Sequence, residues 1–311
     1  MRTAEISDTQ TPKLHDHPGE EGAVWSFPPL SNPPRSAQQL LLSHGELSAA
    51  GWHVGWAQII GPRHNICEDS MAVRFVQQPP ESAPGSTGIY AVMADGVGGG
   101  ARGEVASNAL ALHCIQFSPE SYCTGGMWDD SLRSWLLQSD HVVTQAVRAV
   151  ASQPGASTLA ATWLDPSGQG WISRVGDARA YLVSRVAYQA AADPVQTLDS
   201  PKWQARPVLS DQTYAFLGEL PPAPDLADEP ARMVGAGLIG NPEVVPITVG
   251  DDDTLVLCSD GLHRFFDAET LAALSAEEAD LDAVASTLVC LARARGSDDD
   301  ISVLVLRRKV L

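Results

Sequence analysis

The sequence predicts an α+β protein in which sheets carry helices on their outer faces. Short apolar runs, rich in β-branched and aromatic residues, are separated by Gly, Pro and Asp turn signals, a pattern typical of strands. Two longer segments repeat their apolar residues every three or four positions, which is typical of amphipathic helices. Because the strands come in runs, without strict βαβ alternation, they favour α+β packing.

Each element follows from its own pattern. The helix expected over 280–295 begins with acids, carries Arg293 and Arg295 in its last turn and precedes Gly296, a residue suited to a helix C-terminus. A second helix is expected over 131–150, and the expected order of elements is strands, two helices, strands, a loop, a strand, two helices and a last strand. The expected strands are 56–60, 71–76, 89–94, 158–164, 171–175, 179–183, 254–258 and 301–306.

The chain divides unevenly. Residues 1–48 are rich in Pro, Ser and acids, so we expect a flexible N-terminal arm, with Leu40–Leu42 as a segment that could dock on the core as a short helix. Residues 49–311 form the expected main domain. Within it, residues 186–250 are rich in proline and weakly periodic, and we expect a long excursion from the core there.

Charge and cysteine content exclude several classes of partner and framework. The net charge is −18, with only three lysines, and so acidic a body repels phosphate backbones and anionic lipids; we expect no nucleic acid and no membrane as partner. The five cysteines are odd in number and form no CxxC, which argues against a disulfide framework. The N-terminus has no secretory apolar core and no run reaches the ~18 apolar residues of a membrane span, so we expect a cytoplasmic protein.

Acidic residues gather where the expected strands begin and end. One such residue alone is typical of a turn. Several carboxylates converging from separate strands repel one another unless cations neutralise them, and hard divalent ions prefer such oxygen ligands. The pattern therefore indicates a two-metal hydrolytic centre. The acids are Glu68-Asp69 before a strand, Asp95-Gly96 and Asp260-Gly261 after strands, Asp177 in a turn, and Asp298-Asp299-Asp300 before the last strand.

Six segments in order resemble the motifs of the metal-dependent protein phosphatases (PPM, or type 2C, serine/threonine phosphatases). The resemblance spans nearly all of residues 52–308 and implies a four-layer α/β/β/α sandwich of two antiparallel sheets flanked by helix pairs. It also gives the excursion over 186–250 the place of a substrate-side flap. The segments are Cys67–Ser70, Ala94–Gly99, Gly155–Thr158, Gly176–Leu182, Cys258–Leu262 and Ser297–Ser302.

The resemblance also implies roles at a centre of two manganese or magnesium ions. Asp95 would bridge both ions and the carbonyl of Gly96 would touch one of them. Glu68 would bind one ion, whereas Asp260 and Asp299 would bind the other.

Two further acids receive outer roles from the same resemblance. Asp69 would be a neighbouring or water-mediated acid. Asp177 would share a third, weaker ion with Asp260. The implied reaction is direct attack of a metal-bridging water on phosphoserine or phosphothreonine, with a phosphoprotein as substrate and a cognate serine/threonine kinase as counterpart.

The chain departs from the family pattern around the substrate phosphate. The family commonly has an arginine four residues before the Glu of the first motif, a position held here by His64, with Arg63 one residue earlier. We expect Arg63 to be the phosphate anchor, because arginine offers a permanent charge and a bidentate fork, with His64 as the alternative. Cys67 and Asp300 replace two asparagines of the family pattern.

Two other functions fit parts of the sequence. Gly98–Gly103 matches a GxGxxG dinucleotide motif after a strand, which would indicate an oxidoreductase, but the required second strand ending in an acid does not follow. A non-catalytic phosphoprotein-binding regulator with the same fold is the other alternative. Retention of every expected metal acid argues against it.

Overall fold

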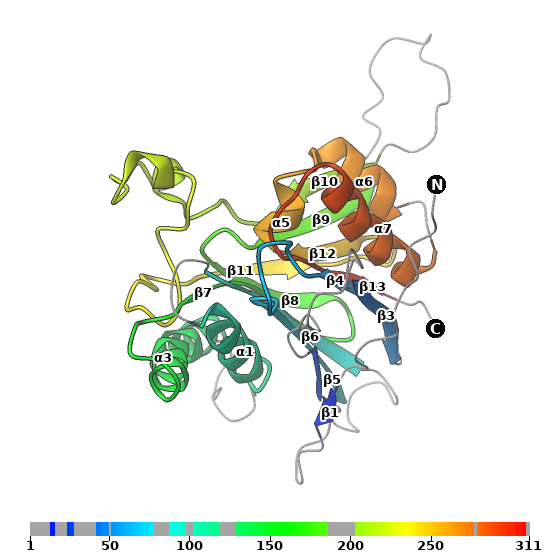
Figure 1. The fold of residues 1–311 in the computed structure, drawn as a ribbon. Helices are drawn as coiled ribbons and strands as arrows, with labels where there is room; N and C mark the ends of the chain where they lie inside the picture. Colours follow the sequence, from blue (N-terminus) through cyan, green and yellow to red (C-terminus); the bar gives the residue numbers. More distant parts are fainter. Residues whose placement is uncertain are drawn as a thin grey trace.

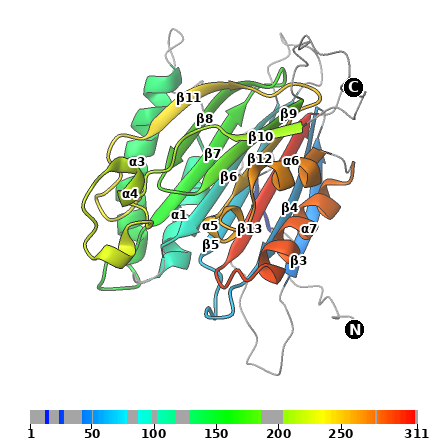
Figure 2. The same cartoon turned by 90° about the horizontal axis from the view of Figure 1, so that it is seen from above.

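Two antiparallel sheets lie face to face in a computed structural model of the chain, and helices cover their outer faces (Figures 1 and 2). The structure describes residues 13–15, 24–27, 42–49, 51–77, 87–97, 102–117, 128–185, 203–276 and 279–308. This is the expected four-layer α/β/β/α sandwich. No helix within these ranges is both long and apolar enough to cross a membrane.

The first sheet has seven strands in the order β1-β2-β5-β6-β7-β8-β11. Its central pair, β5 and β6, runs antiparallel with Asp69 opposite Asp95. β6 is antiparallel to both β5 and β7, so the described sheet contains no parallel βαβ unit around β6, and the dinucleotide interpretation is wrong. The strands are β1 (Lys13–His15), β2 (Val24–Phe27), β5 (Asp69–Gln77), β6 (Thr87–Gly96), β7 (Ser157–Leu164), β8 (Gln169–Val175) and β11 (Glu243–Thr248).

The second sheet has six strands in the order β10-β9-β12-β13-β4-β3, all antiparallel. The chain passes from the first sheet to the second at the turn between β8 and β9, which contains Asp177. The strands are β3 (Leu42–Ala49), β4 (Trp52–Ile59), β9 (Arg179–Arg185), β10 (Trp203–Pro207), β12 (Thr254–Cys258) and β13 (Ile301–Arg308).

The helices pair on the outer faces. α1 (Gly103–Cys114) and α3 (Trp128–Arg148) cover the first sheet, and α6 (Ala268–Ala276) and α7 (Leu281–Ala294) cover the second (Figure 2). The side chain of Asp280 caps α7 by accepting from the amides of Asp282 and Ala283. Three short helices complete the described set: α4 (Tyr214–Leu217), the 3₁₀ turn η1 (Pro224–Leu226) and α5 (Asp260–His263).

Strands buried on both faces explain the continuous apolar runs in the sequence. In β6, Tyr90, Val92 and Ala94 pack toward the helices, whereas Ile89, Ala91 and Met93 pack toward the second sheet. This alternation follows from the period of two in a strand. Three stacked apolar layers result, and they hold both sheets rigidly at the rim where the acids lie.

Parts of residues 1–48 belong to the sheets, which differs from the expected flexible arm ending at residue 48. β2 pairs with β5, and β3 pairs along its whole length with β4. Leu42 lies in β3, so the described part of Leu40–Leu42 is strand and not helix. The excursion over 186–250 likewise contributes two edge strands, β10 and β11, and residues 186–202 within it lie outside the described ranges.

We therefore expect removal of β3 to destabilise the protein. Leu47 packs against the core between the sheets and Leu42 against the core under the helices. Deleting residues 1–50 should cost roughly 3 kcal/mol and lower the soluble yield, because two leucines lose burial and the edge of β4 is exposed. Urea unfolding should give a lower free energy of unfolding for the protein lacking residues 1–50 than for one lacking only residues 1–41, which keeps β3. Equal stability of the two truncated proteins would contradict a structural role for β3.

Candidate metal centre

Four of the expected site acids, all at or next to strand ends, meet at one rim of the sandwich: Glu68, Asp69, Asp95 and Asp260. Asp69 and Asp95 stand opposite each other on β5 and β6. The carbonyl of Glu68 accepts a 3.0 Å hydrogen bond from the amide of Gly96. Asp260 begins α5, which follows β12 of the second sheet, and its amide lies 3.5 Å from Oδ2 of Asp95. Both sheets thus supply acids to the same place.

The crowding is visible in the acids' proton affinities. Removal from water raises the pKa of Asp95, and the charges of Asp69, Asp260, Asp177 and Asp299 raise it further. Burial likewise raises the pKa of Asp69. Burial raises the pKa of Glu68 to about 7 and that of Asp260 to about 6. Such a cluster holds negative charge at neutral pH only with a compensating cation.

The residues fit hard divalent ions. All the donors are oxygens, and the buried Oδ2 of Asp69 has no hydrogen-bond partner within the described ranges. Two glycines allow the backbone to pass close to Glu68. A Cβ on Gly96 would lie 2.6 Å from the carbonyl oxygen of Glu68, and a Cβ on Gly103 would lie 2.8 Å from the carboxylate carbon of Glu68. The absence of these side chains keeps Glu68 against the rim.

Asp300 is the hub of the loop that carries Glu68. Its buried carboxylate accepts from the amides of Gly61 and Glu68, both at 2.6 Å, and lies 2.8 Å from Nδ1 of His64. The neighbouring Asp299 is exposed, and its Oδ1 accepts from the amide of Asp300 at 2.8 Å. One ligand atom each from His64, Asp299 and Asp300 lie within 4.8 Å of one another. Asp300 was missing from the expected site residues.

Replacing Asp300 by Ala should lower the free energy of unfolding by about 3 kcal/mol, because two amides lose their acceptor at roughly 1–3 kcal/mol each. Asp298→Ala is the matched control: within the part of the chain that the structure describes, the carboxylate of Asp298 pairs with the exposed guanidinium of Arg63, and such a pair contributes ~0–1 kcal/mol. Urea titration of both variants measures the difference. Equal losses would mean that Asp300 does not hold this loop.

The contacts distinguish the two residues considered for the substrate phosphate. The side chain of Arg63 is 74% exposed and pairs with Asp298. The side chain of His64 is 27% exposed and joins Asp300 at the acid cluster, and this hydrogen bond raises its pKa to about 9. The charge nearer the metal acids is therefore that of His64, whereas the sequence reasoning favoured Arg63.

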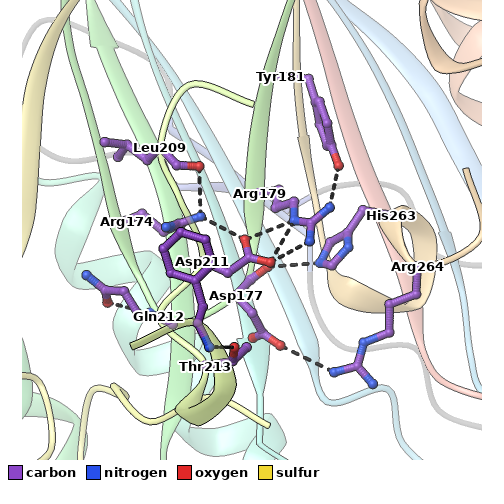
Figure 3. A network of polar contacts seen from close by, with 12 residues as sticks. Arg174, Asp177, Arg179, Tyr181, Leu209, Asp211, Gln212, Thr213, His263 and Arg264 are labelled. Atoms are coloured by element: carbon purple, nitrogen blue, oxygen red, sulfur yellow. Dashed lines mark hydrogen bonds and ion pairs between the residues drawn. The ribbon is translucent and has the colours of Figure 1, made fainter. Parts of the chain in front are cut away.

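Asp177 lies beside the cluster at the turn from β8 to β9, where Gly176 has a φ of 90°. Its side chain is buried, and desolvation raises its pKa to about 7. Figure 3 shows the guanidinium of Arg264 directed at this carboxylate, with Oδ2 at 3.4 Å. The same guanidinium lies 2.8 Å from Oδ2 of Asp260. Neither the position nor the role of Arg264 was expected from the sequence.

A second polar network fixes residues 209–212 within the excursion over 186–250. Asp211 accepts from Arg174 at 2.9 Å and from Nε of Arg179 at 2.9 Å (Figure 3). Gln212 accepts from the amide of Gly176 at 2.9 Å, next to Asp177. From the sequence, this stretch was expected only as part of the excursion over 186–250. Its arginine partners lie on β8 and β9 and become apparent only in three dimensions.

Comparison with known proteins agrees with the motifs. No protein-family profile matches the chain. A serine/threonine phosphatase, stp, of Listeria innocua is 24% identical over 229 residues, which cover 71% of this chain and 84% of that protein. The stp of Listeria monocytogenes is also 24% identical, over 232 residues covering 70% of this chain and 83% of that protein.

Solved structures share the fold. Stp1, a serine/threonine phosphatase of Staphylococcus aureus, superposes with a TM-score of 0.63 at 17% identity and covers 86% of this chain and 99% of its own. The catalytic domain of the phosphatase PstP, solved with two manganese ions, has a TM-score of 0.60 at 19% identity, with coverages of 84% and 99%. PppA of Pseudomonas aeruginosa, described as a key regulatory component of T6SS, superposes with a TM-score of 0.59 at 23% identity. The match covers 84% of this chain and 99% of PppA. The chain therefore resembles bacterial serine/threonine phosphatases in sequence and shares the fold of solved PPM-type phosphatases.

Proposed function

We propose that this protein is a metal-dependent serine/threonine phosphatase that hydrolyses phosphoserine and phosphothreonine in phosphoproteins. The observation that carries the proposal is the convergence of carboxylates from both sheets on one rim, with a buried carboxylate oxygen of Asp69 that lacks a hydrogen-bond partner among the described residues. Retention of this full acid set favours a catalyst over a non-catalytic regulator. The PstP structure with two manganese ions supports a pair of Mn²⁺ or Mg²⁺ ions.

Particular residues have particular tasks in this proposal. Asp95, the carbonyl of Gly96, Glu68, Asp260 and Asp299 would hold two ions, with Asp69 behind them. Such an ion pair activates a water molecule and neutralises charge on the transferring phosphoryl group. The strand pairing of Asp69 with Asp95 fixes the spacing of the acids before any ion binds. Asp300 fixes the backbone of Glu68 through its amide.

Phosphopeptide hydrolysis tests the proposal. Phosphothreonine and phosphoserine peptides should be hydrolysed with Mn²⁺ or Mg²⁺ present, a phosphotyrosine peptide much more slowly, and none of them after EDTA treatment. Restoring the metal should restore turnover. Full activity in EDTA would contradict a metal-dependent reaction, and release of phosphate from the phosphotyrosine peptide alone would contradict the substrate class.

His64 is the residue we expect to support phosphate binding. It is charged at neutral pH, since its pKa is raised to about 9, and it joins the acid cluster through Asp300. His64→Ala should raise KM for a phosphothreonine peptide about tenfold, corresponding to ~1.4 kcal/mol of lost binding. Arg63→Ala, the adjacent control, should change KM by less than about twofold because its side chain is exposed and paired with Asp298.

The reverse order of the two effects would restore Arg63 as the phosphate anchor. The pH profile gives an independent check. Because the imidazolium persists until the pH approaches 9, wild-type KM should stay nearly constant between pH 6 and 8. A KM that worsens steadily across this interval would contradict a charged His64.

A further inference from the structure

Arg264 brings a permanent positive charge into the acid cluster from the end of α5. Its guanidinium lies 2.8 Å from Oδ2 of Asp260, one helical turn earlier, and 3.4 Å from Oδ2 of Asp177. Oε1 of Glu229, which follows η1 in the chain, lies 4.0 Å from the same guanidinium. Arg264 therefore joins two acids that come from different elements and different parts of the chain.

The two acids need such a charge. Their side chains are only 4% exposed for Asp177 and 14% exposed for Asp260. Burial raises the pKa of both carboxyl groups, the charge of Asp260 raises that of Asp177 further, and Arg264 lowers the pKa of both. A guanidinium keeps its charge at every physiological pH and offers several N–H donors in a fixed plane, so it can serve two carboxylates at once.

The position of Arg264 is set by its neighbour. Nε2 of His263 lies 2.9 Å from the backbone carbonyl of Asp177, and the His263 side chain is buried (Figure 3). This contact ties the end of α5 to the turn between β8 and β9. The next residue, Arg264, is thereby held next to the Asp177 carboxylate. The backbone that carries this ion pair is therefore fixed by the buried contact of His263.

These contacts do not fit the third, weaker ion that the resemblance gave to Asp177 and Asp260. The guanidinium already lies against one oxygen of each carboxylate, so a cation occupies the place between them and balances one of their two negative charges without a metal. We infer that Arg264 is the built-in cation of the Asp177–Asp260 pair, and that the centre consequently holds two metal ions and not three. The inference rests on the proposed dimetal function and specifies its ion count.

Metal counting by equilibrium dialysis against Mn²⁺, followed by elemental analysis, tests the inference. The wild-type protein and Arg264→Lys, which keeps the charge, should bind the same number of ions. Arg264→Ala and Arg264→Gln should each bind one more, since they leave the acid pair without a cation. Adding Asp177→Asn to Arg264→Ala should abolish the extra ion. Ions held loosely by the acidic surface cancel in these differences.

Arg232→Ala is the matched control, because Arg232 also forms an ion pair near the flap, with Glu219, but touches neither acid of the pair. Its count should equal that of the wild type. Gel filtration and circular dichroism establish that each counted variant is folded, and the Gln variant keeps hydrogen-bonding capacity if Ala disturbs the fold. An unchanged count in both Arg264→Ala and Arg264→Gln would overturn the inference.

Loss of one ion from the wild type on Asp177→Asn alone would also overturn it, since the pair would then be binding metal beside the arginine. The proposed function fails separately. If the wild-type protein bound no ion at the paired site, the phosphatase proposal would be wrong, while the gain of one ion in Arg264→Ala would still decide the role of Arg264.

Discussion

Replacing Asp95 by Ala should lower kcat/KM for a phosphothreonine peptide by roughly 10³-fold or more. Asp95 lies at the centre of the cluster, since Asp69 stands opposite it in the sheet and the amide of Asp260 approaches its Oδ2. A metal pair supplies several kcal/mol of transition-state stabilisation, and each 1.36 kcal/mol corresponds to a factor of ten in rate. Steady-state kinetics at saturating Mn²⁺ measures the loss.

Asp165→Ala provides the control for this substitution. Asp165 follows β7 at the end opposite to Thr158, which pairs with Asp95, and its carboxylate accepts turn hydrogen bonds from the amides of Ser167 and Gln169. An acid of the same type is thus removed far from the cluster, and turnover should stay within about twofold of the wild type. Near-normal turnover in Asp95→Ala would refute the dimetal mechanism.

The second large effect is on stability. Mn²⁺ should raise the Tm of EDTA-treated protein by about 10 °C at pH 8, because an ion present at 100 times its Kd adds about 2.7 kcal/mol and two ions are expected. In domains of this size, 1 kcal/mol corresponds to ~2 °C or more in Tm. The increase should be much smaller at pH 5, where the cluster retains protons and metal must displace them.

The sign of the pH effect follows from the raised pKa values. Those of Asp260, Glu68 and Asp177 lie at about 6 to 7 in the folded protein, above the ordinary carboxyl range. Between pH 4 and 7 the unfolded chain therefore releases protons that the folded protein keeps. In EDTA, the free energy of unfolding should fall as the pH rises through this interval.

Differential scanning calorimetry with and without Mn²⁺ at several pH values measures both effects. Asp95→Asn should be more stable than wild type in EDTA, because it removes one repelling charge, and should lose most of the Mn²⁺ response. An equal response in this variant would place the stabilising ions elsewhere on the acidic surface. Stability that is independent of pH in EDTA would contradict the raised pKa values.

Sequence patterns predicted the interior of the fold well and its edges poorly. Every strand buried on both faces was recognised by its apolar run. Five strands were missed: the four edge strands, β1, β3, β10 and β11, and the four-residue β2 that lies between β1 and β5. β3 has partly exposed and polar positions, and β11 contains Pro246, which is tolerated where a strand has one free edge. An edge strand is less buried than a central one and therefore carries fewer apolar residues. Because strands were predicted from their apolar residues, edge strands are harder to recognise in the sequence.

The same distinction applies to the candidate site. The acids of the expected metal centre were predicted because they lie next to strand ends, and the ends of apolar runs can be recognised in the sequence. Asp300 and Arg264 act through tertiary contacts, with Gly61 and Glu68 for the first and with Asp177 for the second. Adjacent residues such as Arg63 and His64 point differently according to the local turn, which the spacing alone does not determine.

The distribution of the acids over two sheets has a mechanical consequence. Glu68 precedes β5 and Asp95 lies in β6 of the first sheet, whereas Asp260 follows β12 and Asp299 precedes β13 of the second, so an ion bound between them would join the two sheets as a cross-link does. Asp95 and Asp260 are 165 positions apart in the chain, which makes the closed loop very long. Sliding one sheet over the other would break the proposed coordination, so the proposed metal pair would also resist shear between the two sheets.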